Sequence, residues 1–353
     1  MKLIPPNAYI LTFGLQTGGV ETWIRDFLYF TKGHYKLLPR LASESSVFTV
    51  LDDAESKNTT SPQRATAPCA LFHLVRELRA LRKSSPTLHA HNLKLALLAL
   101  ICATSCPLVY FSHNNFGRQL SSQNIFKRRL YFLLERVVLK KSHMVFTFSR
   151  EDHTRMSRHR QQVELLTGSY NDLLFPSNQK ASNPARSGLL WIGRLSPVKN
   201  PLLALQAFEL LAQNHPSTLT IVGDGPLRRK LEKAVKKCPV GERVTLTGSL
   251  SPDKIRQLLQ TSEVLLVTSL SEGPTPRNIY EALACSTPVV TTRPGDPNMV
   301  IESASAGSTA EKLSPEYFVD AIKKCLVIPT ANYDDVISDN RASEFFPTAE
   351  KKL

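Results

Sequence analysis

With 353 residues, of which 42% are hydrophobic and 21% charged, the chain can bury two cores of about 150 to 200 residues each, and a disordered or collagen-like chain is excluded. Its net charge of +14 lies almost entirely in residues 1–180, which hold 24 Lys and Arg against 12 Asp and Glu, while the remainder holds 20 against 18. A half this basic indicates nucleic acid, an anionic membrane or a polyanionic substrate as its partner, unless the charge only keeps the surface soluble.

The first half is predicted to alternate strands with helices. Met1 to Thr12 lacks the long apolar segment and cleavage site of a secretory signal, so we expect a cytoplasmic protein. The uncharged stretch Leu95 to Phe111 contains Pro107 and polar residues, and is predicted to be a buried helix followed by a buried strand rather than a membrane span. The other elements predicted here are a strand over Ala8 to Phe13, a helix from Val20, and strands at Val47 to Leu51, Leu88 to Ala90 and Leu108 to Ser112.

A linker is expected where this alternation stops. The stretch Phe175 to Gly188 is rich in Pro, Ser and Asn and has no hydrophobic period, which is typical of a connection between domains. Strands and helices alternate again after it. The strands predicted here are Leu189 to Ile192, Leu219 to Val222, Val244 to Leu246, Val264 to Val267 and Pro288 to Thr291, and the helices cover Leu202 to Asn214 or begin after Pro226, at Asp253 and near Pro276.

Strand alternating with helix predicts a parallel, doubly wound sheet in each half. The expected fold is therefore α/β, with two Rossmann-like domains that face each other across a cleft. We expect a first domain over residues 1–176, a linker over 177–188, a second domain over 189–330, and a tail over 331–353 that returns as a helix to the first domain. Open parallel sheets bind ligands beyond the carboxyl ends of their strands, so functional residues should follow the strands directly.

A basic motif follows the first strand of the second half. In Gly193 to Lys199, the Arg can bind phosphate oxygens through two N–H groups and the Lys adds a second positive charge. This pair suits a diphosphate whose negative charge grows as it leaves, although a basic surface pair would look the same. The later turn Ile221 to Pro226 resembles a dinucleotide fingerprint, but Arg228 replaces its third Gly, so no NAD site is expected.

Two glutamates lie near the start of a later predicted helix. Glu272 follows a predicted buried strand, and Glu281 lies about one and a half turns inside the helix that Pro276 opens. The N–H groups at a helix start can bind phosphate or sugar hydroxyls, and carboxylates accept hydrogen bonds from vicinal hydroxyls. The alternatives are an exposed acidic loop for Glu272 and a solvated helix face for Glu281.

Together these motifs closely resemble family 4 glycosyltransferases over about residues 188–326. The resemblance is carried by Gly193 with Arg194 and Lys199, Ile221 to Pro226, Val244 with Gly248, Glu272-Gly273, Glu281 to Cys285 and Thr287 to Val290. It implies the glycosyltransferase-B fold, in which the second domain holds the nucleotide sugar and the first holds the acceptor. It also implies a transfer that retains the anomeric configuration, with no cofactor and with a UDP- or GDP-sugar as donor.

The resemblance reaches into the first half through Gly18 to Glu21, a Gly-rich loop near the donor phosphates, and through His89 to His91. The catalytic residues that it implies are His113, Arg194, Lys199 and Glu272. The donor-binding residues that it implies are Gly18, Gly19, Gly193, Arg194, Lys199, Gly223, Gly225, Glu272, Gly273, Pro274, Asn278 and Glu281. The eight residues between the two glutamates are one more than in the family, and the loop Pro274 to Pro276 would absorb the extra residue.

No metal site is expected, because the chain has no Asp-x-Asp motif and its six cysteines include no CxxC pair. The basic first half then favours a saccharide acceptor at an anionic membrane, such as lipopolysaccharide or a lipid-linked oligosaccharide. A peripheral position on the inner face of the cell membrane would follow. Gln123 to Lys141 is predicted to be a helix with a basic rim and large apolar residues, which suits docking at a membrane surface unless the apolar residues belong to the core.

Two other functions fit the same sequence. The basic half could belong to a protein that binds polyanions or nucleic acid, or the chain could be an inactive transferase-like scaffold. The basic residues lack the interleaved aromatic residues that stack on bases, and no helix-turn-helix or zinc-finger spacing is present, so no nucleic-acid partner is expected.

Overall fold

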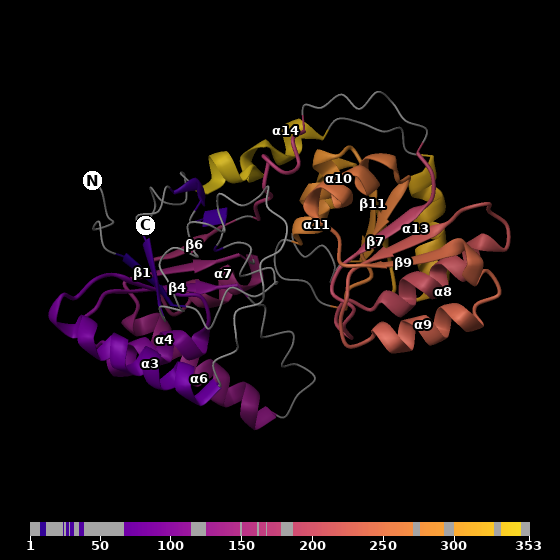
Figure 1. Ribbon diagram of the computed structural model, residues 1–353. Helices are drawn as coiled ribbons and strands as arrows, with labels where there is room; N and C mark the ends of the chain where they lie inside the picture. Colours follow the sequence, from indigo (N-terminus) through magenta and orange to yellow (C-terminus); the bar gives the residue numbers. More distant parts are fainter. Residues whose placement is uncertain are drawn as a thin grey trace. The chain divides into compact units, whose positions relative to one another are not determined.

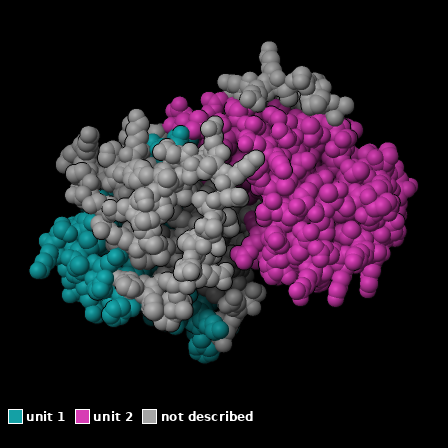
Figure 2. All heavy atoms as spheres, viewed as in Figure 1, with its two compact units in different colours: residues 1–166, 345–353 teal, residues 167–344 magenta. Residues whose placement is uncertain are grey.

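The chain forms two compact units in the computed structural model (Figures 1 and 2). Unit 1 comprises Met1–Leu166 with Phe345–Leu353, and unit 2 comprises Thr167–Glu344. The structure describes residues 8–11, 24, 26–27, 29–31, 35–38, 67–113, 125–148, 150–160, 162–166, 168–177, 186–270, 276–292, 300–327 and 333–346.

The division between the units falls at Leu166, whereas the predicted boundary is at residue 176. The reason is that 168–177 is tied to the segment before the C-terminus. Tyr170 N donates to Asn340 O at 3.0 Å, and Ala342 N donates to Tyr170 O at 2.8 Å. Most of the described part of the predicted tail therefore belongs to unit 2, and the chain passes to unit 1 at Phe345, where the Phe346 ring packs edge-on against Phe27 at 5.7 Å.

Unit 1 is built on a six-stranded parallel sheet in the order β2-β1-β3-β4-β5-β6. Its strands are β1 (Ala8–Leu11), β2 (Tyr35–Leu38), β3 (Leu88–Ala90), β4 (Leu108–Ser112), β5 (Met144–Thr147) and β6 (Val163–Leu165). The predicted strands at β1, β3 and β4 are confirmed, and the one predicted at Val47 to Leu51 lies outside the described residues. The short strands β2, β5 and β6 were not predicted.

In unit 1 the helix α4 lies between α3 and α6 and contacts both of them (Figure 1). The described helices are α3 (Ala67–Ala80), α4 (Leu93–Cys102), α6 (Ile125–Lys141) and α7 (Arg150–Ser157). Asn92 caps α4 by accepting a hydrogen bond from Leu95 N at 2.9 Å, and Arg82 donates to Cys102 O at its other end at 2.8 Å. The stretch from Leu95 to Phe111 is thus helix and then strand, as predicted, and no helix among the described residues has the length and hydropathy to cross a bilayer.

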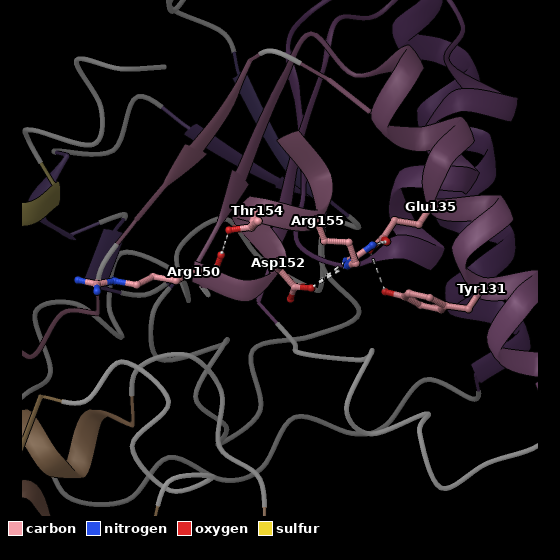
Figure 3. A network of polar contacts seen from close by, with 6 residues as sticks. All are labelled: Tyr131, Glu135, Arg150, Asp152, Thr154 and Arg155. Atoms are coloured by element: carbon pink, nitrogen blue, oxygen red, sulfur yellow. Dashed lines mark hydrogen bonds and ion pairs between the residues drawn. The ribbon is translucent and has the colours of Figure 1, made fainter. Parts of the chain in front are cut away.

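Arg155 joins α6 to α7 inside unit 1 (Figure 3). Its guanidinium contacts Glu135 of α6 and donates to Asp152 Oδ1 of α7 at 2.8 Å, and the side chains of these two acids are 2% and 3% exposed. Burial raises the pKa of Glu135. The burial that would lower the pKa of Arg155 is outweighed by its bonds to both carboxylates, so that pKa is raised. This network fixes which side of α6 faces inward.

Unit 2 is built on a second six-stranded parallel sheet, in the order β12-β11-β10-β7-β8-β9. Its strands are β7 (Leu189–Ile192), β8 (Leu219–Val222), β9 (Val244–Gly248), β10 (Val264–Leu266), β11 (Val289–Thr292) and β12 (Gly307–Ala310). Its helices are α8 (Pro201–Ala212), α9 (Arg228–Lys237), α10 (Pro252–Thr261), α11 (Arg277–Ala284), α12 (Val300–Ala304), α13 (Pro315–Leu326) and α14 (Asp334–Ile337). All five strands predicted here are confirmed, and β12 was missed because Gly307 to Ala310 has no apolar run.

Buried apolar side chains explain why unit 2 follows its sequence pattern so closely. Trp191 of β7, Phe208 of α8 and Phe318 of α13 belong to one core cluster and are at most 2% exposed. Proline opens α8, α10 and α13, where the missing N–H has no intrahelical partner to lose. The sheet is therefore held rigidly enough to position the loops at its carboxyl edge.

Candidate functional site

The strand order of unit 2 reverses beside β7. From β7 the chain winds through β8 and β9 to one edge of the sheet, and β10, β11 and β12 then fill the other side. Ligands of open parallel sheets bind beyond the carboxyl ends of the strands at such a switch point. The loops after β7 and β10, together with the start of α11, form this part of the edge.

The loop after β7 is fastened to the loop after β8. Gly193 N donates to Val222 O at 3.0 Å, and Leu195 N donates to Asp224 O at 2.9 Å. Gly223 has a φ of +132°, and a Cβ at this position would lie 1.9 Å from Gly193 O. Glycine is thus required at 223 because the two backbones touch there, which gives this predicted donor residue a structural role.

The same loop is fastened to the end of β10 by Thr268. The hydroxyl of Thr268 accepts a hydrogen bond from Trp191 Nε1 at 2.9 Å and lies 3.0 and 2.9 Å from the carbonyl oxygens of Lys199 and Asn200, to which it donates. The backbone of Lys199 is thereby held directly before the first turn of α8. Thr268 was not identified from the sequence, where the available signal was a polar residue directly after a predicted apolar strand.

The start of α11 is held against the end of β7. Asn278 Nδ2 donates to Ile192 O at 3.2 Å, so this predicted donor residue binds the protein's own backbone with its amide group. Glu281 lies one turn further along α11 and pairs with Arg277, at 3.8 Å between Oε1 and Nε. Both side chains are largely buried, at 15% and 17% exposure, so the solvated helix face considered for Glu281 is excluded. Arg277 was not identified from the sequence, where its spacing of four residues from Glu281 was the available signal.

The edge of unit 2 therefore carries one exposed cation on a fixed loop. Arg194 is exposed, and it forms no ion pair with any residue in the described part of the chain. Lys199 is half-buried. The predicted site residues Gly18, Gly19, Glu272, Gly273 and Pro274 lie outside the described residues. Among the residues that the structure describes, no group of three His, Cys, Asp or Glu side chains is arranged to hold a metal ion.

In unit 1 the predicted His113 belongs to a pair. His91 follows β3 and His113 follows the neighbouring β4, and His91 Nδ1 lies 2.7 Å from His113 Nε2, at hydrogen-bond distance. Phe111 stacks on His91 at 4.5 Å and Phe148 stacks on His113 at 4.4 Å. Both histidines directly follow predicted strands, but their contact could not be predicted, because it depends on β3 and β4 being neighbours in the sheet.

Burial keeps these histidines neutral. It lowers the pKa of His113 and of His89, inside β3, to about 3. Burial, and then the charges of His113 and His89, lower the pKa of His91 well below its usual range. Within the pair one ring therefore donates the shared hydrogen bond and the other accepts it.

Unit 1 is expected to lose stability as the pH falls below about 6.5, the ordinary pKa of histidine. Between pH 6.5 and about 3 the unfolded chain binds protons on His89 and His113 that the folded unit excludes. The stability is complete above the unfolded pKa and decreases by more than about 1 kcal/mol per pH unit for each buried histidine. Urea unfolding of unit 1, followed by hydrogen exchange of its peptides from pH 8 to pH 5, measures this slope.

The control for this prediction is an exposed histidine of the same unit. His89→Leu should flatten the pH dependence, whereas His143→Leu should leave it as in the wild type because His143 is exposed. Equal slopes in the two variants would contradict the assignment to the buried cluster.

Comparison with known proteins bears on both units. Residues 176–342 match the family model of glycosyl transferases group 1. The chain is similar to the 2-deoxystreptamine N-acetyl-D-glucosaminyltransferase of Streptomyces fradiae, at 25% identity over 276 residues, 71% of this chain and 62% of that protein. It is also similar to the lipopolysaccharide 1,2-N-acetylglucosaminetransferase of Salmonella typhimurium, at 30% identity over 147 residues and 39% of each chain. The matched segments span between 35% and 62% of the length of these and two further curated relatives.

The similarity to solved structures covers nearly the whole chain. A crystal structure of HepE from Anabaena in complex with UDP and glucose matches with a TM-score of 0.75 at 18% identity, over 98% of this chain and 99% of that one. Because the sequence identity is only 18%, this match establishes the fold alone. The chain thus has the glycosyltransferase-B fold, and within it residues 176–342 are similar to the family model of glycosyl transferases group 1.

Proposed function

We propose that the protein is a retaining glycosyltransferase that moves a sugar from a UDP- or GDP-sugar to a saccharide acceptor. The observation that carries the proposal is the loop Gly193 to Asn200, which is bonded to the β8 loop on one side and to Thr268 on the other. This loop presents the exposed Arg194 at the switch point of the sheet, where α/β sheets bind nucleotides. The bound UDP in the HepE structure supports the choice of a nucleotide ligand.

Charge stabilisation is the main catalytic task in this proposal. As the diphosphate leaves, Arg194 and Lys199 stabilise the negative charge that it gains, in place of a metal ion. Because the loop is already fixed, little reorganisation accompanies the reaction. The acceptor hydroxyl approaches from the face that the diphosphate leaves, and the departing phosphate takes its proton.

The donor's other parts are assigned to the remaining predicted residues. Glu281, oriented by Arg277, would accept hydrogen bonds from the ribose hydroxyls. Glu272 would hold the donor sugar. His113, neutral and oriented by His91, would lie near the reacting sugar as a hydrogen-bonding group.

The proposed acceptor is a membrane-linked glycan, such as lipopolysaccharide or a lipid-linked oligosaccharide. The lipopolysaccharide transferase among the curated relatives supports this choice, and so does the excess of positive charge in residues 1–180. The protein would then work in the cytoplasm as a peripheral protein on the inner face of the cell membrane.

The test is to incubate the full chain with a panel of UDP- and GDP-sugars and a membrane lipid extract as the source of acceptor. Release of the nucleoside diphosphate and the anomeric proton of the product are followed by NMR. The proposal predicts release with at least one donor and a product of the donor's own anomeric configuration. An inverted product would contradict the retaining mechanism, and no release with any donor would contradict the transferase.

A further inference from the structure

The outward face of α6 carries a row of exposed aliphatic side chains. Leu130, Leu133 and Val137 are 57%, 60% and 45% exposed. At about 100° per residue these three positions fall within roughly 60° of arc on the helix, and Phe126 extends the row by one turn. We call Leu130, Leu133 and Val137 the α6 stripe. Single exposed apolar residues are ordinary on protein surfaces, but a continuous helical row is not.

The stripe is not the core face of the helix. Glu135, Val138 and Leu139 are the buried residues of α6, and they lie on the opposite side. Glu135 is fixed there by Arg155, as Figure 3 shows. The helix cannot rotate to bury the stripe without exposing Val138 and Leu139 and breaking this ion pair. The core assignment that the sequence left open for the apolar residues of this helix is therefore wrong for these three.

The residues around the stripe are basic. Arg129, Arg136 and Lys140 flank one side of the stripe, and Lys127 and Lys141 flank the other; all five are exposed. The single acidic residue of α6 is the buried Glu135. The exposed surface of this helix thus combines aliphatic side chains with uncompensated positive charge.

We propose that the α6 stripe and its basic flanks dock unit 1 on the surface of an anionic lipid bilayer. The aliphatic row would enter the region between head groups and acyl chains, while the flanking Arg and Lys contact lipid phosphates. Charge complementarity selects this partner, because a second copy of the same face would place positive charges against each other. Nucleic acid fits less well, because the row has a single aromatic side chain, Phe126, whereas proteins that stack on successive bases present several. An anionic bilayer can accept both the aliphatic row and the basic residues that flank it.

The topology of unit 1 shows at which edge of its sheet the docking surface begins. The strands β4 and β5 are parallel, so α6, which connects them, must begin at the carboxyl edge of the sheet and return to the amino edge. His113 follows β4 at that carboxyl edge. The exposed N-terminal turns of α6 therefore lie on the side of unit 1 where the acceptor would bind. Only this statement about position rests on the proposed function.

The experiment is co-sedimentation of the full chain with vesicles of phosphatidylcholine, with and without 30% phosphatidylglycerol, a composition that supplies the anionic charge. Binding is expected only to the anionic vesicles and should weaken steeply between roughly 0.1 and 0.5 M salt, as the Debye length falls. Leu130→Ser with Leu133→Ser should weaken binding at least tenfold. Arg129→Gln with Arg136→Gln and Lys140→Gln should weaken it roughly a hundredfold.

The matched control is α9 of unit 2, which is equally basic but buries or half-buries its apolar residues. Arg229→Gln with Lys233→Gln and Lys236→Gln removes the same charge from exposed positions and should change vesicle binding less than threefold. An equal loss in both triple variants would overturn the proposal, because only total charge would then matter. Thermal unfolding and helix content of the α6 variants should equal those of the wild type, since the changed side chains are exposed.

Two further outcomes would overturn the proposal: no binding of the wild type to anionic vesicles, and a lipid-free dimer that Leu130→Ser with Leu133→Ser dissociates. The second would identify the stripe as a protein interface. The proposed transferase activity is tested separately, by measuring nucleotide release in detergent. This release should be unchanged in the α6 variants. Vesicle binding without nucleotide release would refute only the proposed activity.

Discussion

Replacing Arg194 with alanine is expected to lower nucleotide-sugar turnover about 100- to 1000-fold, the usual effect of removing one donor that stabilises charge in a transition state. The Kd for the donor should change much less, because the diphosphate gains most of its extra charge as the bond to the sugar breaks. The exposed position of Arg194 means that the fold should tolerate the change. The measurement is the rate of nucleoside diphosphate release together with calorimetric titration of the donor.

Arg229→Ala is the matched control for this variant, because it removes an exposed arginine from α9 in the same unit. Its turnover should stay within about twofold of the wild type, as for surface changes remote from the site. A fall in donor affinity as large as the fall in turnover would show that Arg194 binds the ground state and does not act in the reaction step.

Arg155→Met is expected to cost unit 1 about 3 to 5 kcal/mol of stability at pH 7. The variant keeps most of the side-chain volume but leaves Glu135 and Asp152, whose side chains are 2% and 3% exposed, without their cation. The pKa of Glu135 is already raised by burial and would rise further, so the variant should recover part of the loss as the pH falls and this carboxylate is protonated. Hydrogen exchange of the α6 and α7 peptides reports the loss separately from unit 2.

Arg150→Met is the control on the same helix, since Arg150 is exposed and its side chain points away from the network in Figure 3. It should change protection by less than about 0.5 kcal/mol. Adding Glu135→Met to Arg155→Met should restore part of the stability, because it removes one of the two buried carboxylates that Arg155 neutralises. A double variant as unstable as the single one would show that the arginine acts mainly through packing.

The two units differ in how far their sequences predict them. In unit 2 the strands β7, β8, β10 and β11 are short runs of mostly buried residues that begin with apolar side chains, and a Gly, Pro or charged residue bounds each on at least one side, so they could be predicted from the sequence. The strand β12 has no such run and was missed. In unit 1 the strand β6 (Val163–Leu165) is three residues long, which is too short for its apolar–polar–apolar pattern to be distinguished from chance. The division at Leu166 depends on backbone bonds from Tyr170 to residues far along the chain, and no local pattern encodes such bonds.

The candidate site shows the same contrast. Motif residues on the β7 loop could be identified from their position after a strand. Thr268 holds this loop and Asn278 holds the end of β7, both through hydrogen bonds across the sheet edge, and their roles follow only from strand order. The His91–His113 pair likewise depends on two strands being neighbours.

The most direct test of the account is hydrogen exchange of the full chain with and without the best UDP- or GDP-sugar of the panel. Nucleotide binding at the switch point of unit 2 predicts slower exchange in peptides that cover Gly193 to Asn200 and the start of α11, and no change in α9 or α13. Protection confined to other parts of the chain, or none at saturating donor, would contradict the claim that this edge of unit 2 is the donor site.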